Sequence, residues 1–208
     1  MTIDIHNFPN IGFLKVKLNA EQMAPILQEI LEIKQDFLSA SPINKLLAGN
    51  IRKGFDLIKS HNHIELLLQE YVQHYEHTFQ YITKVKVHSD DNMPLHLDRL
   101  WVNFQEKYEF NPPHAHRGVF SFVIWVKIPY NLKNEIALGP GVDSAQPLSG
   151  YFSFHYTDVL GSICNFSIPA DETMENTLLI FPSKLNHSVS PFYSSEDFRI
   201  SVSGNISF

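Results

Sequence analysis

The sequence predicts an α+β protein, mainly β, in which a strand and two N-terminal helices support a β-sandwich or barrel. Apolar residues recur at helical spacing before about residue 90, whereas short β-branched and aromatic runs between turn residues follow it. The composition, 44% hydrophobic and 12% aromatic, is typical of a globular chain. Because 208 residues is close to the size of one domain, we predict a single domain over 1–208, with a strand and helical support region at 1–88 and the β core at 89–208.

The support region contains three predicted elements. Residues 12–18 alternate between apolar and polar types, as a strand does. An apolar stripe over 23–33, preceded by a candidate N-cap at Asn19, predicts the first helix. A second stripe over 64–79 predicts a helix over about 62–82.

Five runs in the second part of the chain predict strands. They are rich in β-branched and aromatic residues, and they cover residues 100–104, 119–128, 151–156, 177–181 and 198–203. Several short strands at this spacing are typical of a sandwich or a barrel. Residues 130–150, which include Gly139 and Gly141, predict a long loop within the β core, and loops of this length often act as lids or binding loops.

Charge and composition exclude several functional classes. Sixteen basic residues against 22 acidic ones give a formal net charge of −6, so we expect no nucleic-acid partner. The single Cys164 cannot form an internal disulfide. The first nine residues lack the features of a signal peptide, and no stretch approaches the ~18 apolar residues of a membrane span. We therefore expect a soluble, cytoplasmic protein with no membrane partner, and the sequence carries no signal for an oligomeric state.

Two histidines separated by one residue, His114 and His116, lie between the predicted strands 100–104 and 119–128. Side chains alternate along a strand with period two, so both imidazoles point to the same side and can reach one ion. This pair is a candidate for metal binding. Exposed loop histidines are the alternative interpretation.

A second candidate group lies nearer the C-terminus. The buried strand predicted over 177–181 leads to His187, which could supply a third metal ligand from the far side of the β core. Arg199 lies between apolar residues in the last predicted strand, where a buried guanidinium requires a carboxylate from the protein or from a ligand. Ser201 faces the same way and offers a hydroxyl to the same acid group. A structural salt bridge is the alternative for Arg199.

Four motifs in this chain occur together in a known family. They lie within residues 45–208 and read Trp101-Val-Asn103, Pro112-Pro-His114-Ala-His116, Phe181-Pro-Ser183-Lys-Leu-Asn-His187 and Arg199-Ile-Ser-Val-Ser-Gly-Asn205. Their order resembles that of the iron(II)- and 2-oxoglutarate-dependent oxygenases. The nearest resemblance is to short prolyl-hydroxylase-like members, including ones carried by tailed phages.

The resemblance implies a double-stranded β-helix, a jelly-roll or cupin-like core, with the N-terminal helices packed on it. It implies an enzyme that uses Fe(II), 2-oxoglutarate and O2 to hydroxylate a C–H bond and releases succinate and CO2. The implied substrate is a prolyl or other amino-acid group, in a peptide or a small molecule. The implied metal ligands are His114, His116 and His187, and the implied 2-oxoglutarate-binding residues are Arg199, Ser201 and Asn103.

The chain departs from this family at one position. The superfamily generally carries Asp or Glu where this sequence has His116. In one interpretation His116 is itself a ligand and completes a three-histidine site; in another, His116 is the first ligand and Gly118 stands at the carboxylate position. A third interpretation takes His96-Leu-Asp98 as the ligand pair.

Two other functions compete with the oxygenase interpretation. A cupin with three histidines would act as a dioxygenase or isomerase without 2-oxoglutarate, but cupins usually carry a Glu a few residues after His-x-His, and residues 117–121 contain none. The other alternative is a non-catalytic β-barrel binding protein. The presence of bound metal would distinguish the enzymes from the binding protein.

Overall fold

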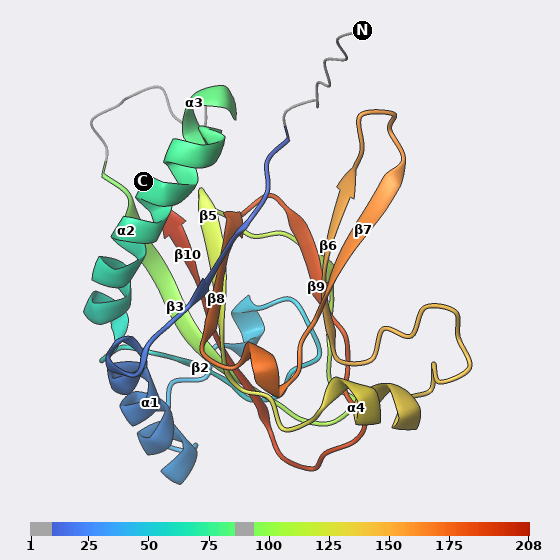
Figure 1. The fold of residues 1–208 in the computed structure, drawn as a ribbon. Helices are drawn as coiled ribbons and strands as arrows, with labels where there is room; N and C mark the ends of the chain where they lie inside the picture. Colours follow the sequence, from blue (N-terminus) through green and yellow to red (C-terminus); the bar gives the residue numbers. More distant parts are fainter. Residues whose placement is uncertain (1–9, 86–93) are drawn as a thin grey trace, which may run out of the picture.

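The computed structural model describes residues 10–85 and 94–208, and its strands form two antiparallel sheets that face each other (Figure 1). The larger sheet has the order β1-β8-β5-β10-β3-β2, and the smaller sheet has the order β4-β9-β6-β7. The larger sheet comprises β1 (Leu14–Lys17), β2 (Gly54–Asp56), β3 (His96–Gln105), β5 (Phe120–Lys127), β8 (Thr177–Pro182) and β10 (Arg199–Ser207). The smaller sheet comprises β4 (Asn111–His114), β6 (Tyr151–Thr157), β7 (Ile163–Pro169) and β9 (Asn186–Val189).

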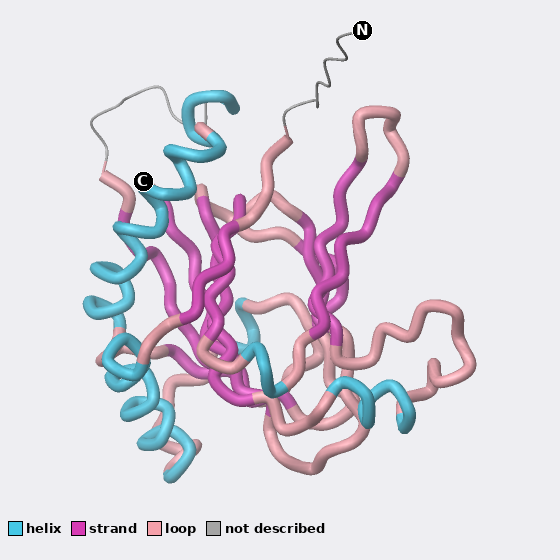
Figure 2. Tube along the Cα trace, in the orientation of Figure 1, coloured by secondary structure: helices cyan, strands magenta, loops and turns pink. Residues whose placement is uncertain are grey.

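The longer helices cover the outer face of the larger sheet (Figure 2). The helices are α1 (Ala20–Gln35), α2 (His61–Phe79), α3 (Tyr81–Val85) and α4 (Leu132–Leu138), and short 3-10 turns span Asn44–Leu46 and Glu172–Met174. The start of α1 is a capping box, in which the Asn19 side chain accepts from the Gln22 backbone N–H and the Gln22 side chain accepts from the Asn19 N–H, each at 2.9 Å. The predicted N-cap at Asn19 is thereby confirmed.

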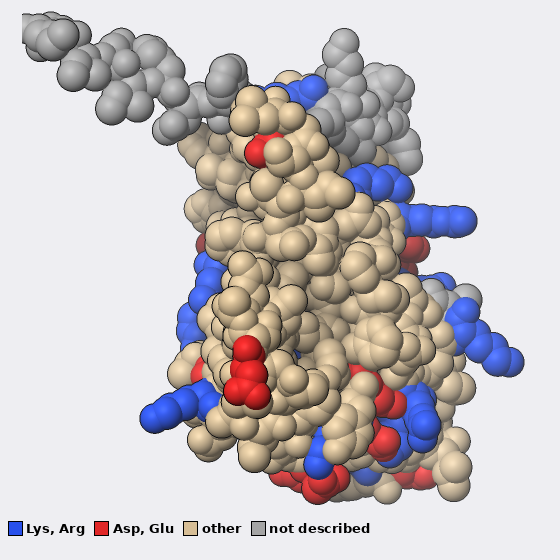
Figure 3. All heavy atoms as spheres, turned by 90° about the vertical axis from the view of Figure 1, so that its right-hand side faces the viewer, with Lys and Arg blue, Asp and Glu red and all other residues tan. Residues whose placement is uncertain are grey.

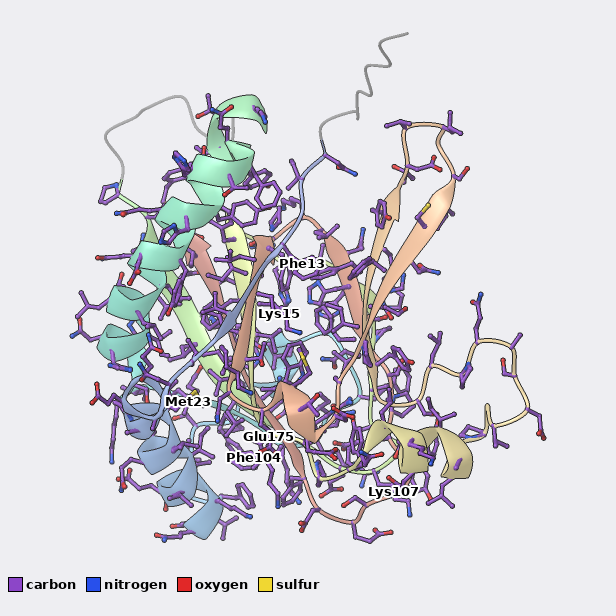
Figure 4. All side chains as sticks on the ribbon, in the orientation of Figure 1. Phe13, Lys15, Met23, Phe104, Lys107 and Glu175 are labelled. Carbon is purple, nitrogen blue, oxygen red and sulfur yellow. The ribbon has the colours of Figure 1, made fainter. Side chains whose placement is uncertain are left out.

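Two hydrophobic layers hold the fold together. The first lies between the helices and the larger sheet and includes Met23, Leu68 and Phe104, of which Met23 and Phe104 are labelled in Figure 4. The second lies between the two sheets and includes Phe152 and Phe181. Residues of β5 and β8 alternate between the two layers, so these strands are buried on both faces. This double burial explains their nearly continuous apolar sequences.

The predicted class, α+β and mainly β, is confirmed, and so are the five strands of the β core. Three details of the prediction were wrong. The helix expected over about 62–82 is two helices, because Gln80 adopts a left-handed conformation with φ of 51° and ends α2. The loop expected over 130–150 contains α4, whose buried Glu135 accepts bonds from the backbone N–H groups of Tyr193 and Ser194. Strands β2, β4, β7 and β9 were not among the expected strands, and β2, β4 and β9 have only three or four residues, which are too few to show a period.

The β6–β7 hairpin extends beyond the body of the molecule (Figure 1). Its exposed apolar residues include Leu160, Ile163 and Phe166. On the face of the molecule seen in Figure 3, charged side chains lie mainly along the margins and the lower part. Among the described residues, no helix is both long and apolar enough to cross a membrane.

Candidate metal centre

Three histidines converge between the two sheets. His114 ends β4, His187 lies directly opposite it on β9, and His116 follows His114 by two residues. One ring nitrogen from each residue lies within 4.8 Å of the other two. The ring centroids are 4.4 Å apart for His114 and His187, 4.9 Å for His114 and His116, and 5.1 Å for His116 and His187. The structure thus brings together the three residues that the sequence singled out.

Backbone contacts fix the segment that carries the pair. The His116 N–H donates to the Ser183 carbonyl at 2.8 Å, which ties this segment to the turn after β8. Gly118 then redirects the chain into β5 with φ of +93°, and a Cβ at this position would lie 2.7 Å from the Ile206 carbonyl oxygen. Position 118 therefore faces the end of β10. Asp98, the other alternative, is an exposed residue on β3 and does not belong to the histidine group.

Hydrogen bonds set the tautomers of two of the imidazoles. His114 Nδ1 contacts the Pro112 carbonyl oxygen at 2.8 Å, and His187 Nδ1 contacts the Leu185 carbonyl oxygen at 3.1 Å. A carbonyl oxygen can only accept, so each Nδ1 carries the proton and donates it. The lone pair of each neutral ring is therefore on Nε2. Outer hydrogen bonds of this kind are usual for histidines that bind metals.

Burial keeps these rings neutral. Burial is the main cause of a lowered pKa of about 4 for His116 and about 3 for His187, and charge repulsion from neighbouring histidines acts in the same direction and is included in these values. Burial also lowers the pKa of His114, although the bond to Pro112 acts in the opposite direction. Neutral imidazole is the form that binds a metal ion, so the cluster is ready to do so at neutral pH.

A narrow cavity of about 50 Å³ connects the histidines to Arg199. Aromatic residues form much of its wall, including Trp101, Trp125 and Phe181. Trp101 is 3% exposed, and its ring centroid is 5.9 Å from that of His116. These walls restrict the access of water to the space between the histidines and the arginine.

Arg199 is buried, and no acidic side chain within residues 10–85 and 94–208 pairs with it. It is 2% exposed, and its guanidinium donates to Gln105 Oε1 from Nε at 3.0 Å and from Nη2 at 2.7 Å. It also donates to the Tyr130 hydroxyl and to the Ser190 carbonyl, each at 2.6 Å. No carboxylate of the described residues lies within 4.0 Å of it, so the alternative of a structural salt bridge was wrong. All four bonds go to neutral acceptors, and the positive charge remains available to an anion in the cavity.

Asn103 and Ser201 lie opposite each other on β3 and β10, and both line the cavity. Asn103 is 6% exposed, and its side-chain oxygen is buried with no hydrogen-bond partner. Buried polar groups are nearly always paired, so the unpaired amide oxygen here is the expected mark of a site for a ligand that donates a hydrogen bond. The site therefore combines metal-binding nitrogens and a buried cation, which fit a divalent metal and a dicarboxylate, whereas the Asn103 oxygen can accept only from a ligand group that carries a proton.

Sequence reasoning did not identify Gln105 and Tyr130, which hold the Arg199 guanidinium. Gln105 shares a face of β3 with Trp101 and Asn103, so period-two alternation along this strand was a usable signal for it. Tyr130 follows β5 in a segment that was expected to be a loop, and no pattern in the sequence connects it with Arg199.

Comparisons with known proteins identify the family and the fold. A family model described as "Putative 2OG-Fe(II) oxygenase" matches residues 99–205. A prolyl-4-hydroxylase from Pseudomonas putida superimposes with a TM-score of 0.53 at 13% identity, over 93% of this chain and 90% of that one. A viral collagen prolyl hydroxylase from Paramecium Bursaria Chlorella virus-1 gives 0.51 at 11% identity, over 93% and 94% of the two chains. No curated protein sequence matches the chain.

The chain has the double-stranded β-helix fold of these structures, and the N-terminal helices pack on that core. The chain belongs to the 2OG-Fe(II) oxygenase family, since the family model covers more than half of its length. Fe(II) and 2-oxoglutarate are the cofactors of this family. The expectations for family, fold and cofactors are confirmed.

Proposed function

We propose that this protein is an Fe(II)- and 2-oxoglutarate-dependent dioxygenase that hydroxylates a C–H bond. The observation that carries the proposal is one cavity lined by three neutral imidazoles and by a buried arginine that has no acidic partner in the part of the chain that the structure describes. Bound Fe(II) would supply the activation of O2, with 2-oxoglutarate as the two-electron reductant. One oxygen atom enters succinate as CO2 is lost, and the other enters the product hydroxyl.

Each residue of the site has a defined part in this proposal. His114, His116 and His187 present nitrogen lone pairs to the metal, and two of them are held in the correct tautomer by backbone carbonyls. Arg199 binds the distal carboxylate of 2-oxoglutarate. The Ser201 hydroxyl and the side-chain NH2 of Asn103 donate hydrogen bonds to the same acid. Trp101 and its aromatic neighbours exclude water from the reacting groups.

The proposed substrate is a prolyl or other amino-acid group of a peptide or small molecule. The support is the likeness in fold to prolyl hydroxylases, one of which, from Trichoplax adhaerens, was solved with a peptide fragment of hypoxia inducible factor. That structure matches with a TM-score of 0.50 at 13% identity, over 94% of this chain and 82% of that one.

Succinate release tests the proposal. Iron-loaded protein with O2 and 2-oxoglutarate should form succinate slowly without substrate, and the correct substrate should accelerate it. Proline-containing peptides, free amino acids and nucleosides are the classes to screen. If a preparation that holds iron and 2-oxoglutarate releases no more succinate than the His187→Ala variant, the oxygenase proposal is wrong and a binding protein remains.

A further inference from the structure

The tip of the β6–β7 hairpin presents apolar side chains to solvent, beyond the body of the molecule (Figure 1). Val159 is 67% exposed and Leu160 is 87% exposed. The turn that carries them is ordered by the Asp158 carboxylate, whose Oδ1 accepts from the N–H groups of Leu160 and Ser162, each at 2.9 Å. Large apolar side chains held exposed on an ordered turn are typical of a contact surface.

A cleft of about 680 Å³ lies between this hairpin, the segment before β1 and the turn that joins β8 to β9. Its apolar wall includes Phe13, Phe154, Phe166 and Leu185. The ring centroid of Phe13, which is labelled in Figure 4, is 5.0 Å from that of Phe154 and 5.5 Å from that of Phe166. The cleft and the cavity of the metal centre share no lining residue, so the cleft is a separate feature of the molecule.

The hairpin tip and the cleft carry opposite charges. Asp158 is the only Asp, Glu, Lys or Arg in residues 151–169. Lys184 is the only residue of these four types that lines the cleft. Neither residue forms an ion pair with another residue of the described ranges 10–85 and 94–208. An apolar tip with one acid therefore matches an apolar cleft with one base.

The tip of a chain cannot fill the cleft of the same chain. Leu160 is six residues beyond Phe154 of the cleft wall, and an extended strand rises about 3.3 Å per residue, so about 20 Å separates them. Hydrogen bonds between β6 and β7 keep the hairpin extended. A two-fold axis across two hairpins, in contrast, can bring the tip of each copy to the cleft of the other. One chain thus carries both halves of a self-complementary contact.

We propose that two copies of this chain form a two-fold symmetric dimer in which the hairpin tip of each copy enters the cleft of the other. Leu160 packs against the aromatic wall, and Asp158 pairs with Lys184 of the partner subunit. Figure 3 views the molecule from the hairpin side, and the upper part of this face carries few charged side chains. Two chains with a net charge of −6 each can therefore approach at this face with little repulsion.

Sedimentation velocity of the full chain tests the proposal without metal, cosubstrate or activity. The wild type should dimerise at micromolar concentrations. Lys184→Asp places two acids opposite each other in both contacts of the dimer, so it should weaken dimerisation at least about tenfold, and Asp158→Lys should do the same with two bases. The matched control is Lys133→Asp, which makes the same charge change on α4, outside the cleft, and should dimerise as the wild type does.

A mixture of the two charge variants tests the pairing itself. An equimolar mixture of Asp158→Lys and Lys184→Asp should dimerise as the wild type does, because both acidic positions of one chain then face both basic positions of the other. Leu160→Ser removes the apolar tip without a change in charge and should also weaken the dimer. Circular dichroism checks that each variant is folded, and the recovery in the mixture stands as a second check.

Three results would overturn the inference. A wild type that remains a monomer throughout the micromolar range would refute the dimer and leave the cleft to a different partner. Dimerisation of Lys184→Asp that is as strong as that of the wild type would refute the contact of tip and cleft. A mixture that dimerises no better than either charge variant alone would refute the pairing of Asp158 with Lys184 of the partner subunit.

Discussion

Replacement of Arg199 by Ala should weaken the binding of 2-oxoglutarate to the metal-loaded protein. The four hydrogen bonds to Gln105, Tyr130 and Ser190 leave one of the five N–H donors of the guanidinium free, and none of these bonds neutralises its charge. Loss of one partner of a buried charged pair costs about 2–5 kcal/mol. Because only one donor is free, we expect the lower part of this range, about 2–3 kcal/mol, or roughly a 30- to 150-fold loss of affinity.

The effect on folding has to be measured separately. The Ala variant leaves the acceptors on Gln105 and Ser190 without their donor, at about 1–3 kcal/mol for each buried group. It also removes a buried charge without an acidic partner, which acts in the opposite direction. Arg199→Lys keeps the charge but cannot reproduce the fork of donors, so it should restore binding only in part.

Calorimetric titration of Co²⁺-loaded protein with 2-oxoglutarate is the assay for this prediction, with pyruvate as the control ligand. Arg199→Ala should weaken 2-oxoglutarate binding and leave pyruvate binding nearly unchanged, because pyruvate has no distal carboxylate. If both ligands weaken equally, or if 2-oxoglutarate binds the variant as it binds the wild type, Arg199 does not bind the distal acid.

Three further predictions follow from the site and its supports. His187→Ala should abolish binding of divalent metal, as measured by metal analysis. The control variant is His155→Ala, because His155 contacts the Ser188 hydroxyl and lies outside the histidine cluster; this variant should still bind metal. In metal-free protein, buried His116 and His187 stay neutral below pH 6.5, whereas the same histidines take up protons in the unfolded chain. The free energy of unfolding should therefore fall as the pH drops from about 6.5 towards 4, by up to about 1.4 kcal/mol per pH unit for each histidine. Urea titrations measure this slope, and a profile as steep in a His187→Gln variant would contradict its cause. Gly118→Ala should destabilise the fold by about 1 kcal/mol or more in the same assay, because φ is +93° and the new Cβ would meet the Ile206 carbonyl oxygen; an unchanged denaturation midpoint would contradict this.

Much of the candidate site could be predicted because its residues lie on strands with clear patterns. His114 and His116 are two residues apart, and Arg199 and Ser201 are again two apart, so period two places each pair on one face. A charged residue among apolar neighbours marked Arg199 as buried, and it is 2% exposed. Two of its three acceptors could not be predicted, because Tyr130 and Ser190 come from segments with no periodic signal.

In the fold, too, elements with a clear sequence pattern could be predicted and elements without one could not. Strands β5 and β8 were recognised from apolar runs that reflect burial on both faces. Strand β9 was not, since Asn186–Val189 is four residues long and only its partners β4 and β6 make it a strand. Helix α4 is held by tertiary contacts of Glu135 with the segment after β9, and its seven residues are too few for a helical stripe.

Anomalous diffraction from crystals grown with Co²⁺ and 2-oxoglutarate tests the central claim most directly. One metal ion should lie about 2.0–2.2 Å from a nitrogen of each of His114, His116 and His187. The distal carboxylate of 2-oxoglutarate should lie at the Arg199 guanidinium. A metal bound elsewhere, or 2-oxoglutarate bound away from Arg199 in a protein whose histidines are free of metal, would contradict it.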